Sequence, residues 1–188
     1  MSKIKDNIVT RGLSGKLGKQ IVFRQWSGDT FLAKAPVVNS SSTKSEMRLQ
    51  SMLRFKDATI YAKKAMNDAE LKQAYQKKCK ARQNAYARAV QDFFIAPSIE
   101  EIDVSNYTGE PDSFIQVYAI DDFRVKRVKV RIEDNESNEV DAGWAEREGN
   151  TDWWRYMATV PNPLPEGGKV IAFAYNQPGN EATKEVIL

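Results

Sequence analysis

The sequence contains no histidine and a single cysteine, Cys79. The lack of histidine excludes a Ser-His-Asp or Cys-His catalytic site and removes the commonest general acid or base. One cysteine excludes a disulfide within the chain and, with no histidine, a structural zinc site of the Cys/His type. No uninterrupted apolar run approaches the ~18 residues of a membrane-spanning helix. These absences argue against catalysis, so we expect a protein that is not an enzyme and has no cofactor, metal or membrane partner.

What is present is the composition of a globular protein. Of 188 residues, 41% are hydrophobic and 28% charged, which is enough apolar material for a core. The first six residues are polar and lack the apolar region of a secretory signal. We therefore expect a cytoplasmic location, with incorporation into a virion as the alternative.

Charge divides the chain into two unlike halves. Residues 1–97 hold 19 Lys/Arg and 7 Asp/Glu, a net charge of +12, whereas residues 98–188 hold 9 and 18, a net charge of −9. A basic half favours a polyanionic partner. The same asymmetry is also explained by attraction between the halves, within one chain or between copies. We interpret 1–97 and 98–188 as two domains.

The basic half begins with strand and turn signals. Three glycines spaced by three, the last being Gly18, predict a flexible or tightly turned segment. Residues 19–26 and 30–33 are rich in β-branched and aromatic residues and flank a Ser-Gly-Asp turn. They predict a β-hairpin. A polar linker, residues 39–42, follows it.

Two long helices are predicted next. Thr43 and Glu46 fit a capping box, so a helix is expected from there to about Met66. Residues 67–70 are a second helix-start signal, and apolar side chains recur at helical spacing from residue 71 to 93. The tight connection predicts a long αα-hairpin that ends before Pro97.

The acidic half reads as seven short strands separated by turn-rich segments. This pattern is typical of an immunoglobulin-like (Ig-like) β-sandwich. Val125 is out of phase with the alternation that follows it, which predicts a bulge or a strand start there. Trp153 and Trp154 are expected on opposite faces, and at least one tryptophan in the core. The predicted strands are 99–104, 113–120, 123–132, 139–145, 152–160, 169–175 and 183–188. The fold class is therefore α+β and multidomain: a β-hairpin and a long αα-hairpin followed by a seven-stranded Ig-like β-sandwich.

Several short motifs occur along the chain: Gly12-Leu-Ser-Gly-Lys-Leu-Gly-Lys19, Val22-Phe-Arg24, Asn84-Ala-Tyr86, Gln91-Asp-Phe93, Tyr107-Thr-Gly109, Asp121-Asp-Phe123 and Pro178-Gly-Asn180. Through these motifs nearly the whole chain resembles a family of uncharacterised proteins from gut Bacteroidetes and their mobile elements. The resemblance implies an N-terminal β-hairpin with a helical hairpin and an attached Ig-like domain, and it implies no activity and no functional residue. One departure is the segment from Asn39 to Thr43, which lacks the proline usual in related sequences.

Basic residues interleaved with aromatic ones make up the candidate site. Cations neutralise phosphates and rings stack on bases, so this pattern suits nucleic acid as well as an acidic protein. The alternative is that the rings pack on the helices and the lysines are merely solvated. The candidate contact residues are Lys16, Lys19, Arg24, Trp26, Lys34, Lys77 and Lys80.

Acidic residues gather at the predicted strand ends of the second half, for example Asp121, Asp134 and Asp141. Hard oxygen ligands of this kind can bind Ca²⁺, but turn formation and solvation explain these acidic residues adequately, so we expect no metal site.

The sequence leaves two hypotheses for the function. The first is a structural, assembly or interaction protein without enzyme activity, with protein partners or other copies of itself, related to a phage or mobile element and displaying an Ig-like module. The second is a nucleic-acid-binding protein that uses the basic half.

Overall fold

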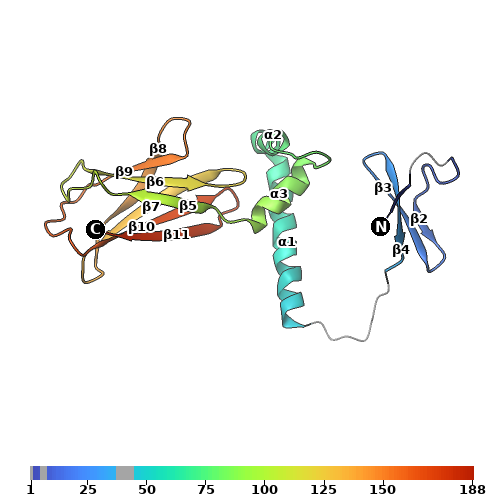
Figure 1. The fold of residues 1–188 in the computed structure, drawn as a ribbon, viewed down its shortest axis with the longest axis horizontal. Coiled ribbons are helices and arrows are strands. Elements are labelled where there is room, and N and C mark those ends of the chain that lie inside the picture. Colours follow the sequence, from blue (N-terminus) through green and yellow to red (C-terminus); the bar gives the residue numbers. More distant parts are fainter. Residues whose placement is uncertain (1, 5–7, 37–44) are drawn as a thin grey trace. The chain divides into compact units, whose positions relative to one another are not determined.

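The computed structural model describes residues 2–4, 8–36 and 45–188, and its fold is mixed α+β. The chain separates into two compact units, Met1–Met52 and Leu53–Leu188. The first unit holds a four-stranded sheet and the first residues of a long helix, and the second holds the rest of the helices and a seven-stranded sheet (Figure 1). The segment with the predicted cap Thr43 and the polar linker 39–42 lies outside the described residues.

The small sheet is antiparallel, in the order β1-β4-β3-β2. A two-residue turn joins β3 to β4, and both of its residues, Ser27 and Gly28, have positive φ angles of 52° and 82°. This turn geometry matches the right-handed twist of paired strands, and glycine adopts it without steric cost. Among its described residues the sheet region buries only Thr30 and Ala35. The strands are β1 (Ser2–Ile4), β2 (Gly15–Leu17), β3 (Ile21–Trp26) and β4 (Asp29–Lys34).

Three helices follow: α1 (Glu46–Asn67), α2 (Ala69–Lys77) and α3 (Ala85–Phe94). The Asp68 carboxylate accepts a hydrogen bond from the Leu71 amide at 3.0 Å, which confirms the predicted second helix start. The prediction of one continuous helix over 71–93 is wrong. Arg82 has a positive φ of 65°, and Asn84 caps a new helix by accepting from the Ala87 amide at 2.8 Å.

The helices of the second unit share a small apolar core. Ala62 and Ala65 of α1 pack with Tyr75 of α2 and Ala89 of α3, and small side chains let these helices approach closely. Phe123, from the turn before β7, belongs to the same core and stacks on Tyr75 with ring centroids 4.0 Å apart. The helices are therefore fastened to one end of the large sheet.

The large sheet is antiparallel, in the order β11-β10-β7-β8-β9-β6-β5. Its last strand, β5, returns to contact β10 and β11, so the sheet is nearly closed as a barrel. All seven predicted strands are present, with ends shifted by a few residues. They are β5 (Ser98–Asp103), β6 (Phe114–Ile120), β7 (Val125–Glu133), β8 (Glu139–Arg147), β9 (Trp153–Met157), β10 (Lys169–Asn176) and β11 (Glu181–Ile187).

Alternation along the strands builds the core of this sheet. Val128, Val130 and Ile132 of β7 are fully buried, as are Ile115 and other side chains of the neighbouring strands. Trp154 is buried in the same core, and the preceding Trp153 faces the other way, against Tyr118 on β6, as predicted.

Two further points bear on the sequence predictions. Val125 begins β7 and pairs with Asn176 next to a register shift, which confirms the predicted irregularity there. The compact units do not coincide with the predicted domains, because α2 and α3 belong to the same unit as the large sheet. Separate folding of 1–97 and 98–188 stays a prediction.

Candidate binding surfaces

The strand register collects part of the predicted site on one face of the small sheet. Lys16 pairs with Val22, and Arg24 and Trp26 are the next two residues of β3 on that face. Phe31, paired with Arg24, adds an aromatic ring 6.1 Å from that of Trp26. Trp26 is 55% exposed, so a basic and aromatic surface faces outward.

The other predicted contact residues are not on this face. Lys34 pairs with Ile21 and points to the opposite side of the sheet, and Lys19 lies in the turn between β2 and β3. Lys77 ends α2 and Lys80 lies in the α2–α3 connection, so both belong to the second compact unit. The sequence pattern therefore combined residues from both faces of the small sheet and from the second unit.

The opposite face of the small sheet is mainly apolar and also carries Lys34, Gln25 and Thr30. Cross-strand pairing places five apolar side chains on it, none of them buried. They are Ile4, Leu17, Ile21, Phe23 and Leu32.

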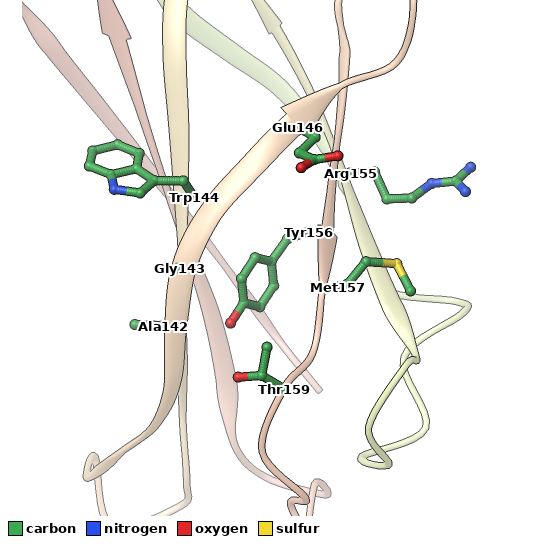
Figure 2. A pocket seen from close by; sticks show the side chains of 8 residues that line it. All are labelled: Ala142, Gly143, Trp144, Glu146, Arg155, Tyr156, Met157 and Thr159. Carbon is green, nitrogen blue, oxygen red and sulfur yellow. The ribbon is translucent and has the colours of Figure 1, made fainter.

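A groove lies between β8 and β9 in the large sheet. The two strands pair only at Glu146 with Arg155 and at Arg147 with Trp154, and beyond these residues they diverge. The groove has a volume of about 300 Å³. Figure 2 shows the Tyr156 ring between the two strands, with Met157 along β9.

Tyr156 and Gly143 shape the floor of this groove. A Cβ atom at position 143 would lie 2.7 Å from Cε2 of Tyr156, so the ring packs where only glycine leaves space. Burial raises the pKa of the Tyr156 hydroxyl. Next to it, the buried Asp141 accepts hydrogen bonds from the amide (2.7 Å) and hydroxyl (2.9 Å) of Thr159, which ties β8 to the chain after β9. Burial raises the pKa of Asp141, but these bonds outweigh it and hold that pKa below its usual value.

A cluster of cations and rings adjoins the groove on the outer face of β8, β7 and β10. The Arg127 guanidinium carbon lies 4.5 Å from the centroid of the Trp144 ring and 5.0 Å from that of Tyr175. Trp144 is 52% exposed and also lines the groove (Figure 2). Further along the same two strands, the guanidinium carbon of Arg131 on β7 lies 5.4 Å from the centroid of the Phe173 ring on β10. Five of the nine Lys/Arg residues after position 97 lie within 124–131.

The sequence prediction missed this cluster. Alternating cations along β7 were visible, but their aromatic partners come from β8 and β10, 17 and 48 residues beyond Arg127. Only the strand register brings these three strands side by side, and register depends on long-range packing.

A buried polar junction fastens the helices to the large sheet. Arg88 of α3 is 1% exposed and donates to the Asp122 carboxylate at 2.6 Å and to its backbone oxygen at 2.7 Å. The Asn176 side chain donates to the Ile95 carbonyl at 2.7 Å, and the Asn180 side chain donates to the same oxygen at 2.9 Å. The Arg88 hydrogen bond lowers the pKa of Asp122.

The second part of this junction is a chain of hydroxyls that ends on Asp92. Tyr75 donates to Asp92 at 2.6 Å, and its oxygen also lies 2.6 Å from the Tyr61 hydroxyl. Burial raises the pKa of Asp92 to about 6, although the Tyr75 hydrogen bond opposes the shift. The dense packing and hydrogen bonding of these groups fit a structural role.

The acidic residues at the strand ends mostly accept from backbone amides. Asp121 accepts from the amides of Phe123 and Arg124, and Asp134 accepts from those of Glu136 and Asn138. Within the residues that the structure describes, no three acidic or cysteine side chains are grouped as a metal site would require.

No family model, curated protein or solved structure matches this chain. Among the described residues, no helix has the length and apolar character needed to cross a membrane. The functional argument therefore rests on the surfaces of this chain.

Proposed function

We propose that this protein is an assembly or interaction protein without enzyme activity. In this proposal the small sheet and the beginning of α1 bind other protein chains, and the large sheet is an Ig-like interaction module. The observation that carries the proposal is the small sheet itself, which buries only Thr30 and Ala35 among its described residues. A folded sheet normally needs an apolar layer against one face, so an external surface is the natural cover.

The apolar face of the small sheet provides that contact surface. Phe23 and Leu32 pair across β3 and β4, with Ile21 and Leu17 beside them. None of these four side chains is fully buried within the chain, and Leu17 is 63% exposed. Burial of apolar area contributes about 25 cal/mol per Å², so covering this face would stabilise an assembly substantially.

The beginning of α1 supports the same conclusion. Met47 is 79% exposed and Leu53 61% exposed, and Met52 is also exposed. At 100° per residue these side chains lie on different sides of the helix. A helix that is apolar on several sides is normally buried, so α1 is suited to contact another chain.

The strand order supports the Ig-like module. Strands β5, β6 and β9 are adjacent, and so are β8, β7, β10 and β11. Placing the first, second and fifth strands in one layer and the other four in a second is typical of Ig-like sandwiches. The resemblance to mobile-element proteins motivates a phage or mobile-element setting.

The mass of the full chain in solution tests this proposal. We expect light scattering after size exclusion to give a mass well above the 21.3 kDa of one chain. Leu53→Glu is expected to lower that mass, because it puts a charge into the apolar contact. Gln50→Glu is the matched control, since it adds the same charge at an exposed polar position of α1. A strictly monomeric protein with no bound partner at high concentration would refute the proposal.

Nucleic-acid binding is the second candidate, favoured by the shared face of Lys16, Arg24 and Trp26. Binding to single-stranded DNA or RNA should then weaken steeply with salt, since cations release counterions from the phosphates. Arg24→Glu should weaken it further. An absence of binding at low salt excludes this candidate.

A further inference from the structure

The groove lies where β8 and β9 separate. Their pairing ends at Glu146–Arg155, so the stretch of β8 around Gly143 and the stretch of β9 around Met157 are not paired with each other. The Tyr156 ring packs against Gly143 in this gap, and hydrogen bonds between Asp141 and Thr159 join the two sides again. A ligand therefore lies over the groove and contacts its side chains.

The volume of the groove limits what it binds. Ligand pockets usually measure roughly 300–1,000 Å³, so about 300 Å³ lies at the lower end. The floor is the Tyr156 ring, and Trp144 and Met157 are among the lining side chains (Figure 2). Such a space holds one or two apolar side chains of a longer ligand.

Beside the groove, Arg127 presents an oriented positive charge. Its guanidinium lies over two rings, Trp144 and Tyr175, and forms no ion pair within the described part of the chain. Stacking on rings holds a guanidinium in place while its N–H groups remain available, and they match the geometry of a carboxylate. Lys129 follows on the same face, paired with Trp144. The complementary ligand is anionic.

The surrounding charge favours a protein ligand over nucleic acid. The half that carries this surface has a net charge of −9, and Glu146 lines the groove itself. A chain of regularly spaced phosphates would meet that negative field, whereas a segment with two or three carboxylates meets mainly Arg127 and Lys129.

We propose that the groove between β8 and β9, with the adjoining Arg127–Trp144 cluster, binds an extended protein segment that carries acidic residues next to an apolar one. This inference rests on the proposed function, since it treats the large sheet as an interaction module, and it names the surface and the partner class. It uses none of the residues of the small sheet.

Fluorescence anisotropy with the full chain tests this assignment. The probe is a labelled ten-residue peptide in which two glutamates flank one leucine in a serine background. A peptide with lysines in place of the glutamates and a single-stranded oligothymidine are the comparison probes. We expect the acidic peptide to bind, and Arg127→Glu and Trp144→Ala each to weaken it about tenfold or more. Lys72→Glu, at an exposed position of α2, is the charge-matched control and should leave binding unchanged. Circular dichroism establishes that each variant is folded.

Three outcomes of the anisotropy experiment bear on the assignment of the groove. Absence of peptide binding at low salt, or equal binding by Arg127→Glu and the Lys72→Glu control, overturns the assignment. Tighter binding of the oligothymidine that is lost in the same variants reassigns the surface to nucleic acid and also overturns it. Peptide binding by a strictly monomeric chain would refute the assembly role and leave this surface standing, because the mass measurement depends on the small sheet and α1.

Discussion

The two sheets of this protein have similar local sequence patterns but differ in how many side chains they bury. Both are antiparallel and contain tight turns and branched or aromatic side chains. The seven-stranded sheet encloses a core that includes Ile115, Val130 and Trp154, whereas the four-stranded sheet buries little more than Thr30 and Ala35. Strand pairing alone therefore does not bury an apolar layer, and packing of the strands around a shared core does.

This difference separates what each sheet can do. A sheet with its own core can carry a binding surface on its outside, because its stability does not depend on the ligand. A sheet without one gains stability by being covered, so its folding and its binding are coupled. The three helices pack with the large sheet, which has its own core, because Arg88 and Phe123 join them to it.

The largest expected effect comes from matched truncations in the two sheets. Ile115→Ala removes a fully buried side chain from the large core, so we expect the free energy of unfolding of the second unit to fall by about 4 kcal/mol. Phe23→Ala, in the small sheet, should change it by less than about 1 kcal/mol, because Phe23 belongs to the other compact unit.

Urea denaturation followed by circular dichroism measures both. The comparison between the sheets would fail if Phe23→Ala destabilised the second unit as much as Ile115→Ala does. That outcome would mean that the two sheets unfold as one cooperative structure.

A somewhat smaller effect is expected from Arg88→Met. The substitution keeps an apolar stem but removes both hydrogen bonds to Asp122, whose side chain is 38% exposed and gains water in exchange, so we expect a loss of about 2 kcal/mol. Because Arg88 joins α3 to the turn before β7, hydrogen exchange should accelerate in α2 and α3 before it does in β7 and β10. Equal acceleration of hydrogen exchange in the helices and throughout the large sheet would show that the helices and the sheet open as one unit.

The sequence was sufficient to predict the elements that depend on local patterns. The seven strands follow from alternation and turn residues, and the bulge near Val125 follows from one residue out of phase. The start of α2 follows from Asp68. The break before α3 was missed, although Asn84 is an N-cap residue, because apolar spacing continues across it.

Contacts between distant residues could not be predicted in the same way. Asn176 donates to Ile95, 81 residues earlier, and the Arg127 cluster joins three strands. These contacts depend on how the helices and strands pack, and local patterns do not contain that information. For the same reason, the seven candidate contact residues from the sequence lie on more than one surface.

The smallest expected effect is a pH dependence confined to the second unit. The folded-state pKa of Asp92 is about 6, against 3.8 for the ordinary carboxyl. Between about pH 4 and pH 6 the folded state therefore binds more protons at this group than the unfolded state does. The stability that Asp92 contributes must fall as pH rises through this window, by roughly 1–2 kcal/mol.

The variant Asp92→Asn isolates this effect, because the amide keeps an oxygen for the Tyr75 hydroxyl and cannot ionise. Asp121 titrates in the same direction and Asp122 in the opposite one, so the informative quantity is the difference between variant and natural protein. That difference in the free energy of unfolding should shift in favour of the variant from pH 4 to pH 6, and Phe23→Ala should show no such trend. A difference that is constant over this range would mean that Asp92 is already ionised at pH 4, and that burial at the helix–sheet junction is looser than its 0% exposure indicates.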